Sequence, residues 1–207
     1  MSSRELILAR VRRNEPAWRE LPPIPEFSGP LVDPLATFAT ALQRMGGTCA
    51  EAPPGSTLDE FLRFRFPDAR VICSATPEVA GTRRVDAVRH PAELADVDVG
   101  VVRAAFGVAE TGSVWLSERE LGVNALGFLA QHLVVLLDPA SIVATLHDAY
   151  RHPGFREARY AVLMTGPSAT ADIEGVLIRG AQGIRSLTVI PAAASGNSHD
   201  VHGGETA

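Results

Sequence analysis

Residues 132–139 read HLVVLLDP, an unbroken apolar run that passes directly into an acid–proline pair. The run of leucine and valine after His132 predicts a strand that is apolar on both faces, as in the interior of a parallel sheet. Asp138-Pro139 then predicts a helix start, because aspartate caps free backbone N–H groups and proline suits the first helical position. The stretch therefore predicts a strand–helix unit of an α/β protein.

The same alternation continues on both sides of this stretch. Helices are predicted at 2–14, 33–46, 58–66, 138–150 and 170–179, and strands at 48–52, 70–74, 97–105, 113–116, 132–137, 160–164 and 186–190. The short turn 107–112 between two of these strands indicates a local antiparallel hairpin. The predicted fold class is α/β, a mostly parallel sheet with helices on both faces plus that hairpin.

Composition shifts divide the chain into three parts. Residues 1–32 form an N-terminal helix and a proline-rich arm, whose apolar side chains predict that it lies along the body. Residues 33–190 form the α/β domain. Residues 191–207 are small and polar and predict a disordered tail.

Charge and composition exclude several classes of protein. The net charge of −5 argues against general nucleic-acid binding, which needs a dense basic surface. No run approaches the roughly 20 apolar residues of a membrane span, and the N-terminus lacks a signal peptide, so a cytoplasmic location is expected. Two cysteines cannot build a zinc or iron–sulfur centre alone, and no histidine cluster has metal-ligand spacing, so no metal site is predicted.

The turn 107–113, GVAETGS, is the first segment that could carry chemistry. Glu110 is flanked by small residues at a strand end, where a carboxylate can act as base, ligand acceptor or nucleophile. Thr111 and Gly112 would line the same ligand site. The alternative is a plain hairpin turn whose glycines supply unusual backbone angles and whose glutamate faces water.

The loop 165–174, TGPSATADIE, is the second such segment. Gly166, Ser168 and Thr170 would offer backbone amides and hydroxyls to a phosphate or carboxylate at the start of a helix. In an open parallel sheet, ligands gather beyond the carboxyl ends of the strands, where this loop is expected. Ser168 or Thr170 could equally be a helix cap, and nearby acids would repel an anion.

His132 is the histidine most apt to line a site, because it borders the glutamate hairpin in sequence, although a structural histidine is the stronger interpretation. Other signatures are missing from the chain. No lysine follows the glycine of a phosphate-binding loop, and there is no GxGxxG fingerprint or GxSxG nucleophile elbow.

Three blocks in order, GVAETGSVWL (107–116), FLAQHLVVLL (128–137) and TGPSATADIEGVLIRGAQG (165–183), resemble the LUD-domain family. The resemblance covers roughly residues 33–190. It implies a fold similar to that of the NagB, ribose-5-phosphate isomerase and CoA-transferase group. Related folds use a strand-end glutamate for acyl transfer, which makes Glu110 the candidate catalytic residue by analogy of fold.

The resemblance also implies a function. The chain would be a cluster-free subunit that works with iron–sulfur partner proteins to oxidise L-lactate to pyruvate, with no cofactor held by its own motifs. Two alternatives stay open: a standalone enzyme that processes acyl or phosphate esters through Glu110, and a non-catalytic assembly protein. A small carboxylate or phosphate is the expected ligand, and the sequence leaves open whether the chain forms a homo-oligomer.

Overall fold

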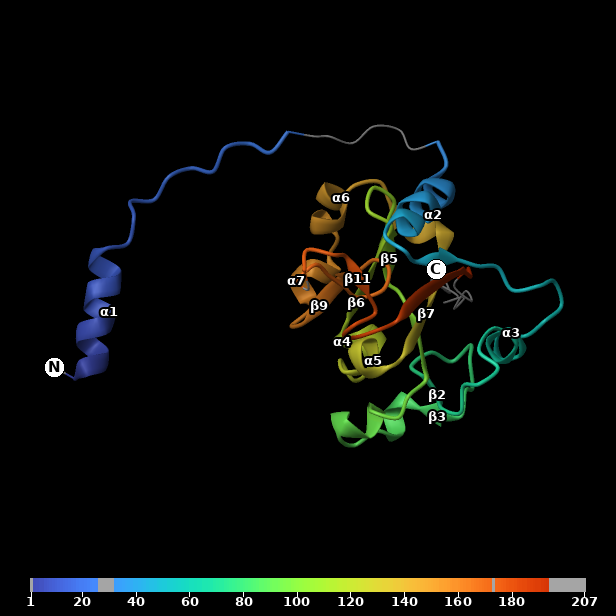
Figure 1. Ribbon diagram of the computed structural model, residues 1–207. Helices are drawn as coiled ribbons and strands as arrows, with labels where there is room; N and C mark the ends of the chain where they lie inside the picture. Colours follow the sequence, from blue (N-terminus) through green and yellow to red (C-terminus); the bar gives the residue numbers. More distant parts are fainter. Residues whose placement is uncertain (1, 26–31, 173, 194–207) are drawn as a thin grey trace, which may run out of the picture.

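The computed structural model describes residues 2–25, 32–172 and 174–193 (Figure 1). Its main sheet has six strands, and every neighbouring pair is parallel. Their order across the sheet is β1 (Thr48–Cys49), β12 (Ser186–Pro191), β7 (His132–Leu137), β4 (Val99–Arg103), β2 (Ile72–Ser74) and β3 (Arg83–Arg84). The predicted parallel sheet is confirmed, with the HLVVLL strand at its centre.

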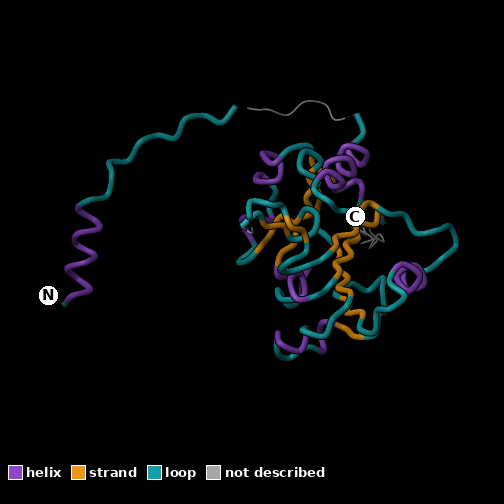
Figure 2. Tube along the Cα trace, viewed as in Figure 1, coloured by secondary structure: helices purple, strands orange, loops and turns teal. Residues whose placement is uncertain are grey.

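A second sheet of four strands lies beside the first (Figure 2). Its order is β8 (Ile142–Val143), β5 (Phe106–Val108), β6 (Ser113–Ser117) and β9 (Ala161–Met164). Strands β5 and β6 form the predicted antiparallel hairpin, in which Phe106 is paired with Trp115. The hairpin therefore belongs to the second sheet and not to the main parallel sheet.

The central strand β7 buries side chains on both faces of the main sheet. Leu133, Val135 and Leu137 contribute to one core, and Val134 and Leu136 to the other. Successive side chains of a strand point to opposite faces, which produces this division, and burial on both faces explains why residues 133–137 are all apolar.

Helices cover both faces of the main sheet. The first core is closed by α2 (Pro34–Arg44), α5 (Leu126–Leu129) and the second sheet, and the second core by α3 (Leu58–Arg65). The chain moves across the sheet in one direction from β1 to β2 and in the opposite direction from β3 through β4 and β7 to β12. Because parallel crossovers are right-handed, opposite directions place the connections on opposite faces.

Aromatic side chains form a third core on the outer face of the second sheet. Phe106 and Trp115 stack with ring centroids 5.3 Å apart, and Phe155 packs against both rings. The short helices α6 (Leu146–Arg151) and α7 (Gly154–Glu157) cover this face. Other short elements are α4 (Glu118–Leu121) and the 3-10 turns η1 (Val85–Ala87), η2 (Pro91–Leu94) and η3 (Pro139–Ser141).

The predicted helix starts in the first third of the chain are confirmed. Ser2 and Glu5 form a capping box at α1 (Ser3–Arg13), and Asp33 caps α2 by accepting a hydrogen bond from the N–H of Ala36 at 2.9 Å. These bonds join residues three positions apart, so local sequence is sufficient to specify them.

The expectation that the proline-rich arm lies along the body is wrong for its described part. Trp18 and Leu21 are each 86% exposed, and Ile24 is 70% exposed. Figure 1 shows α1 and this segment standing apart from the two sheets. Proline has no N–H group to donate to an edge strand. The proline-rich arm therefore cannot form a regular hydrogen-bond ladder that would hold its apolar side chains against the domain.

The predicted helix over 138–150 is interrupted. Asp138 does cap a helical turn, η3, but Ile142 and Val143 then extend and pair with β5. A second start follows at Thr145, whose side chain and that of Asp148 form a capping box for α6. The β-branched pair is better accommodated beside the hairpin than in a helix.

The predicted helix over 170–179 is also wrong. The segment is instead an antiparallel pair, β10 (Ala169–Thr170) and β11 (Ile178–Arg179). Glu174 and Gly175 have φ values of 55° and 70° at the turn between them. A glycine in the middle of the segment favours such a turn over a continuous helix.

The cysteines are free thiols, and Cys73 is fully buried. None of the helices in the described ranges is both long and apolar enough to cross a membrane. The predicted tail falls outside the described residues from 194 onward. Residues 191–193 continue from β12, where the N–H of Ala192 donates to the carbonyl of Leu137 at 2.8 Å.

Candidate functional site

The structure divides the predicted site residues between two regions. Glu110, Thr111 and Gly112 form the tip of the β5–β6 hairpin, and the loop after β9 lies beside this tip, because the hydroxyl of Thr165 donates to the carbonyl of Thr111 at 3.2 Å. His132 is elsewhere, at the amino end of β7. Its nearness in sequence to the hairpin does not place it in the same site.

The Glu110 side chain is exposed and caps a helix. Its Oε2 accepts a hydrogen bond from the N–H of Leu146 at 2.9 Å, at the start of α6, and its own N–H donates to the carbonyl of Ala144 at 3.0 Å. A carboxylate at a helix N-terminus is stabilised by the free N–H groups there. The geometry thus gives Glu110 a structural contact, while its predicted catalytic role stays a prediction.

Both glycines of these segments are close-packed against α2 and the loop that follows it. A Cβ on Gly112 would lie 2.1 Å from the backbone nitrogen of Leu42, and one on Gly166 would lie 2.3 Å from the carbonyl oxygen of Met45. Both have positive φ, 65° and 68°. Close backbone approach therefore requires glycine at these two positions whether or not a ligand binds.

Ser168 directly precedes β10, and Thr170 is the second residue of that strand. The backbone of Ser168 bonds to Ile184 and Gly180, and the Thr170 hydroxyl accepts a hydrogen bond from the N–H of Asp172 at 3.3 Å. Gly166 and Ser168 line a cavity of about 430 Å³ together with Phe128 and other mostly apolar residues. With no helix following this loop, the predicted helix-start anion site has no dipole to supply its charge.

The same loop does not lie at the carboxyl ends of the parallel strands, where we expected it. It follows β9, which pairs antiparallel with β6 in the second sheet. The carboxyl edge of the main sheet instead carries polar residues that bind one another: Ser74, Thr76, Glu78, Arg84 and Arg103. Arg103 Nε donates to Glu78 Oε1 at 2.6 Å, and Arg103 Nη1 donates to the Ala192 carbonyl at 2.9 Å.

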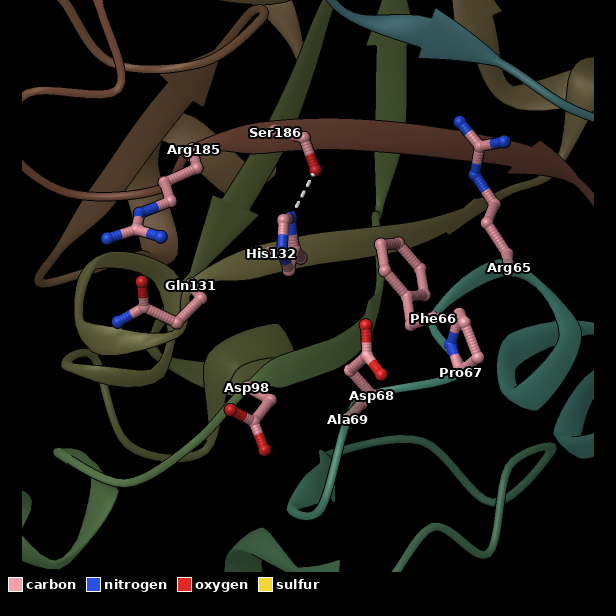
Figure 3. Close-up of a pocket in the computed structure, with 10 residues that line it drawn as sticks. All are labelled: Arg65, Phe66, Pro67, Asp68, Ala69, Asp98, Gln131, His132, Arg185 and Ser186. Atoms are coloured by element: carbon pink, nitrogen blue, oxygen red, sulfur yellow. Dashed lines mark hydrogen bonds between the residues drawn. The ribbon is translucent and has the colours of Figure 1, made fainter.

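The opposite, amino edge of the main sheet holds an open polar cavity of about 550 Å³ (Figure 3). It lies where β4, β7 and β12 begin, next to the loop after α3. The lining residues are Arg65, Phe66, Pro67, Asp68, Ala69, Asp98, Gln131, His132, Arg185 and Ser186. We call this feature the amino-edge cavity.

His132 and Ser186 form the polar centre of the amino-edge cavity. They are direct partners in the register of β7 and β12, so their side chains lie on the same face of the sheet. His132 Nδ1 and Ser186 Oγ are 2.7 Å apart, and the Phe66 ring centroid lies 5.0 Å from that of the imidazole. Figure 3 shows Arg185 and Gln131 to one side of this pair and Phe66 and Asp68 to the other.

The surroundings of His132 favour its neutral form. Burial, and then the positive charge of Arg185, lower the pKa of His132, while Asp98 opposes the shift. Asp98 is itself engaged with the backbone, since its Oδ2 accepts hydrogen bonds from the N–H groups of Arg70 and Val71 at 2.8 and 2.9 Å. A neutral imidazole bonded to a hydroxyl can accept or donate a proton within the cavity.

Sequence inspection identified only His132 in this cavity. Ser186 is the first residue of a predicted strand. Knowing that this strand pairs with β7 would have identified Ser186 as the neighbour of His132, but the order of strands in a sheet cannot be predicted from hydrophobic periodicity. Arg185, Gln131 and Asp98 give no motif because they lie far apart in the chain. Across the described ranges, no group of three or more His, Cys, Asp or Glu residues is arranged to hold a metal ion.

Comparison with known proteins agrees with the fold. The model of the LUD domain matches residues 83–190, slightly more than half of the chain. Lactate utilization protein C of Deinococcus radiodurans is 32% identical over 102 residues, and the match spans 48% of each protein, about half of that relative's length. The crystal structure of a DUF162 family protein from the same organism superimposes with a TM-score of 0.57 at 19% identity, covering 76% of this chain and 95% of that one.

The matched residues include the β5–β6 hairpin, the whole of β7, all of β12 except its last residue, and the His132–Ser186 pair. The chain belongs to the LUD domain family.

Proposed function

We propose that this chain acts in lactate utilization, as the cluster-free subunit of a system that oxidises L-lactate to pyruvate with iron–sulfur partner proteins. The observation that carries the proposal is the 32% identity to a protein named lactate utilization protein C, within a LUD domain. Because two cysteines are too few to hold an iron–sulfur cluster alone, the clusters in this proposal reside on the partners.

A genetic and biochemical experiment tests the role. Deletion of the gene should abolish growth on L-lactate, and the intact protein supplied in trans should restore it. Affinity-tagged protein from lactate-grown cells should bring down iron–sulfur proteins, and lactate-dependent dye reduction by that preparation should require this chain. Oxidation that proceeds at full rate without the chain would refute the proposal.

The predicted catalytic role of Glu110 can be examined in the same assay. Glu110→Gln keeps an oxygen that can accept the hydrogen bond from Leu146 N–H, so the fold is expected to survive. If Glu110 acts as base or nucleophile, the variant should lose at least about 100-fold in rate. Glu157→Gln, an exposed change on α7, is the matched control. Equal rates in both variants would leave Glu110 with only its contact to α6.

A role in assembly has specific support from the N-terminal segment. Leu6, Ile7 and Val11 on α1 are each more than half exposed, and the arm exposes Trp18 and Leu21. Apolar side chains presented together in this way mark a protein-binding surface. Removal of residues 1–25 should leave a folded domain that no longer co-purifies with the partner proteins. Co-purification that survives the truncation would exclude this role.

A further inference from the structure

We propose that the amino-edge cavity is a binding site for a small carboxylate, with Arg185 as its charge partner and the His132–Ser186 pair as its hydrogen-bonding partner. The choice of a lactate-sized acid as probe rests on the proposed function. The site itself rests on the cavity and on the groups that line it.

Two cations, Arg65 and Arg185, line the cavity. Within the described parts of the chain, the Arg185 guanidinium has no carboxylate at ion-pair distance, whereas Arg103 and Arg83 are bonded to Glu78 and Asp96 at 2.6 and 2.8 Å. Figure 3 shows the Arg185 side chain on the Gln131 side of His132, with its guanidinium directed away from the imidazole, while Arg65 lies on the opposite side, beyond Phe66. A planar guanidinium without a protein acceptor matches the two oxygens of a carboxylate.

The cavity also contains two acids, Asp98 and Asp68, and neither forms an ion pair with Arg185. Asp98 holds the sheet edge through the N–H groups of Arg70 and Val71. Asp68 is exposed and belongs to the loop after α3, on the Phe66 side of the cavity. At His132 the positive charge of Arg185 has a larger effect than the negative charge of Asp98, so an anion placed between Arg185 and His132 meets a net attraction.

The His132–Ser186 pair can offer a hydrogen-bond donor to a ligand in the cavity. If the serine hydroxyl donates to Nδ1, the imidazole carries its proton on Nε2. If Nδ1 carries the proton, it donates to Ser186 and frees the hydroxyl hydrogen instead. In each arrangement one donor, either the Nε2–H group of His132 or the hydroxyl of Ser186, is left to bind a carboxylate oxygen of the ligand.

The site couples binding to pH in a definite direction. Arg185 disfavours the charged imidazole, and a bound carboxylate offsets that repulsion, so binding raises the pKa of His132. Protonation of His132 therefore favours binding, and affinity increases as pH falls through the titration of His132. The charged groups that face this histidine are Arg185 and Asp98, with Arg65 and Asp68 on the same cavity wall.

Calorimetry on the full chain tests the site with L-lactate and with lactamide, its neutral analogue. L-lactate should bind and lactamide should bind far more weakly. Arg185→Gln should weaken L-lactate binding by about 10- to 100-fold, as expected for a lost charge-assisted hydrogen bond. Arg156→Gln, on exposed α7, is the control and should bind as the wild type does. His132→Gln should bind with a flat pH profile.

Equal binding of lactamide and L-lactate, or equal weakening by Arg185→Gln and Arg156→Gln, would overturn the site, and so would the absence of any binding to the wild type. These results are separable from a failure of the proposed function. A chain that binds no carboxylate but is essential for growth on lactate refutes the site alone. A chain that binds L-lactate through Arg185 but is dispensable for that growth refutes the function alone.

Discussion

The two edges of the parallel sheet use their polar residues in opposite ways. At the carboxyl edge, Ser74 and Thr76 are at most 2% exposed, and the Arg84 guanidinium donates to the Ser74 hydroxyl and to the carbonyls of Thr76 and Val79. The Thr76 hydroxyl bonds to Glu78, which pairs with Arg103. At the amino edge, Arg185 and the His132–Ser186 pair face an open cavity.

This difference shows what separates a structural cluster from a candidate site. Ligands in open α/β sheets usually lie beyond the carboxyl ends of the strands. Here the described residues at that edge satisfy one another, so they stabilise loops. The amino edge leaves an unpaired cation next to a neutral histidine, and an unsatisfied charge beside a cavity indicates ligand binding more strongly than position in the fold does.

The largest effect is expected when the carboxyl-edge cluster is broken. Arg103→Met removes the partner of the Glu78 carboxylate and the donor to the Ala192 carbonyl, and should lower the free energy of unfolding by about 2–3 kcal/mol. Urea denaturation measures the change. Adding Glu78→Gln should restore part of the loss because it removes the unpaired charge. A loss below about 0.5 kcal/mol for Arg103→Met would show that the cluster is not a structural clamp.

A smaller effect is expected for Asp98, an acid of the amino-edge cavity that is bonded to the backbone. Asp98→Ala leaves the N–H groups of Arg70 and Val71 without their acceptor and should cost about 1–2 kcal/mol. Asp68→Ala, in the same cavity but exposed, should change stability by less than about 0.5 kcal/mol. Equal losses in the two variants would contradict the structural role assigned to Asp98.

The two edges should also respond to acid in different pH ranges. The pKa of His132 is lowered by burial and by Arg185, so the folded state resists protonation, and stability declines as pH falls from the ordinary histidine pKa toward the folded one. Burial favours a raised pKa for Glu78, but hydrogen bonds from Thr76 and Arg103 lower it overall, so its contribution is lost only at more acidic pH. His132→Gln should abolish the first decline alone when unfolding is measured across pH 4–8. A first decline that persists in this variant would assign it to another group.

The smallest effect on stability is expected for Arg185→Gln, which should stay within about 0.5 kcal/mol of the wild type, because the guanidinium has no ion-pair partner among the described side chains to lose. The same variant is expected to show the greatest loss of carboxylate binding. Thermal and urea unfolding measure the stability of the variant directly. A loss above about 1 kcal/mol would mean that Arg185 has a structural role and would weaken its assignment to a ligand.

Local signals predicted some elements well and others poorly. The capping bonds of Ser2 and Asp33 could be predicted because donor and acceptor lie three residues apart. The predicted helix over 170–179 is absent because Gly175 favours a turn in the middle of the segment. The helix over 138–150 failed because Ile142 and Val143 pair with a strand more than 30 residues earlier in the chain, a long-range contact that periodicity does not record.

By itself, the sequence determined the α/β class, the apolar core strand HLVVLL, the β5–β6 hairpin and the family. Each of these depends on side-chain periodicity or on residues close together in the chain. Only the tertiary structure decided which strands share a sheet, that Glu110 contacts the start of α6, and that His132 meets Ser186, 54 residues away, in an open cavity. Strand order is set by the packing of the whole core, and a site assembled from strand ends exists only once that order is fixed.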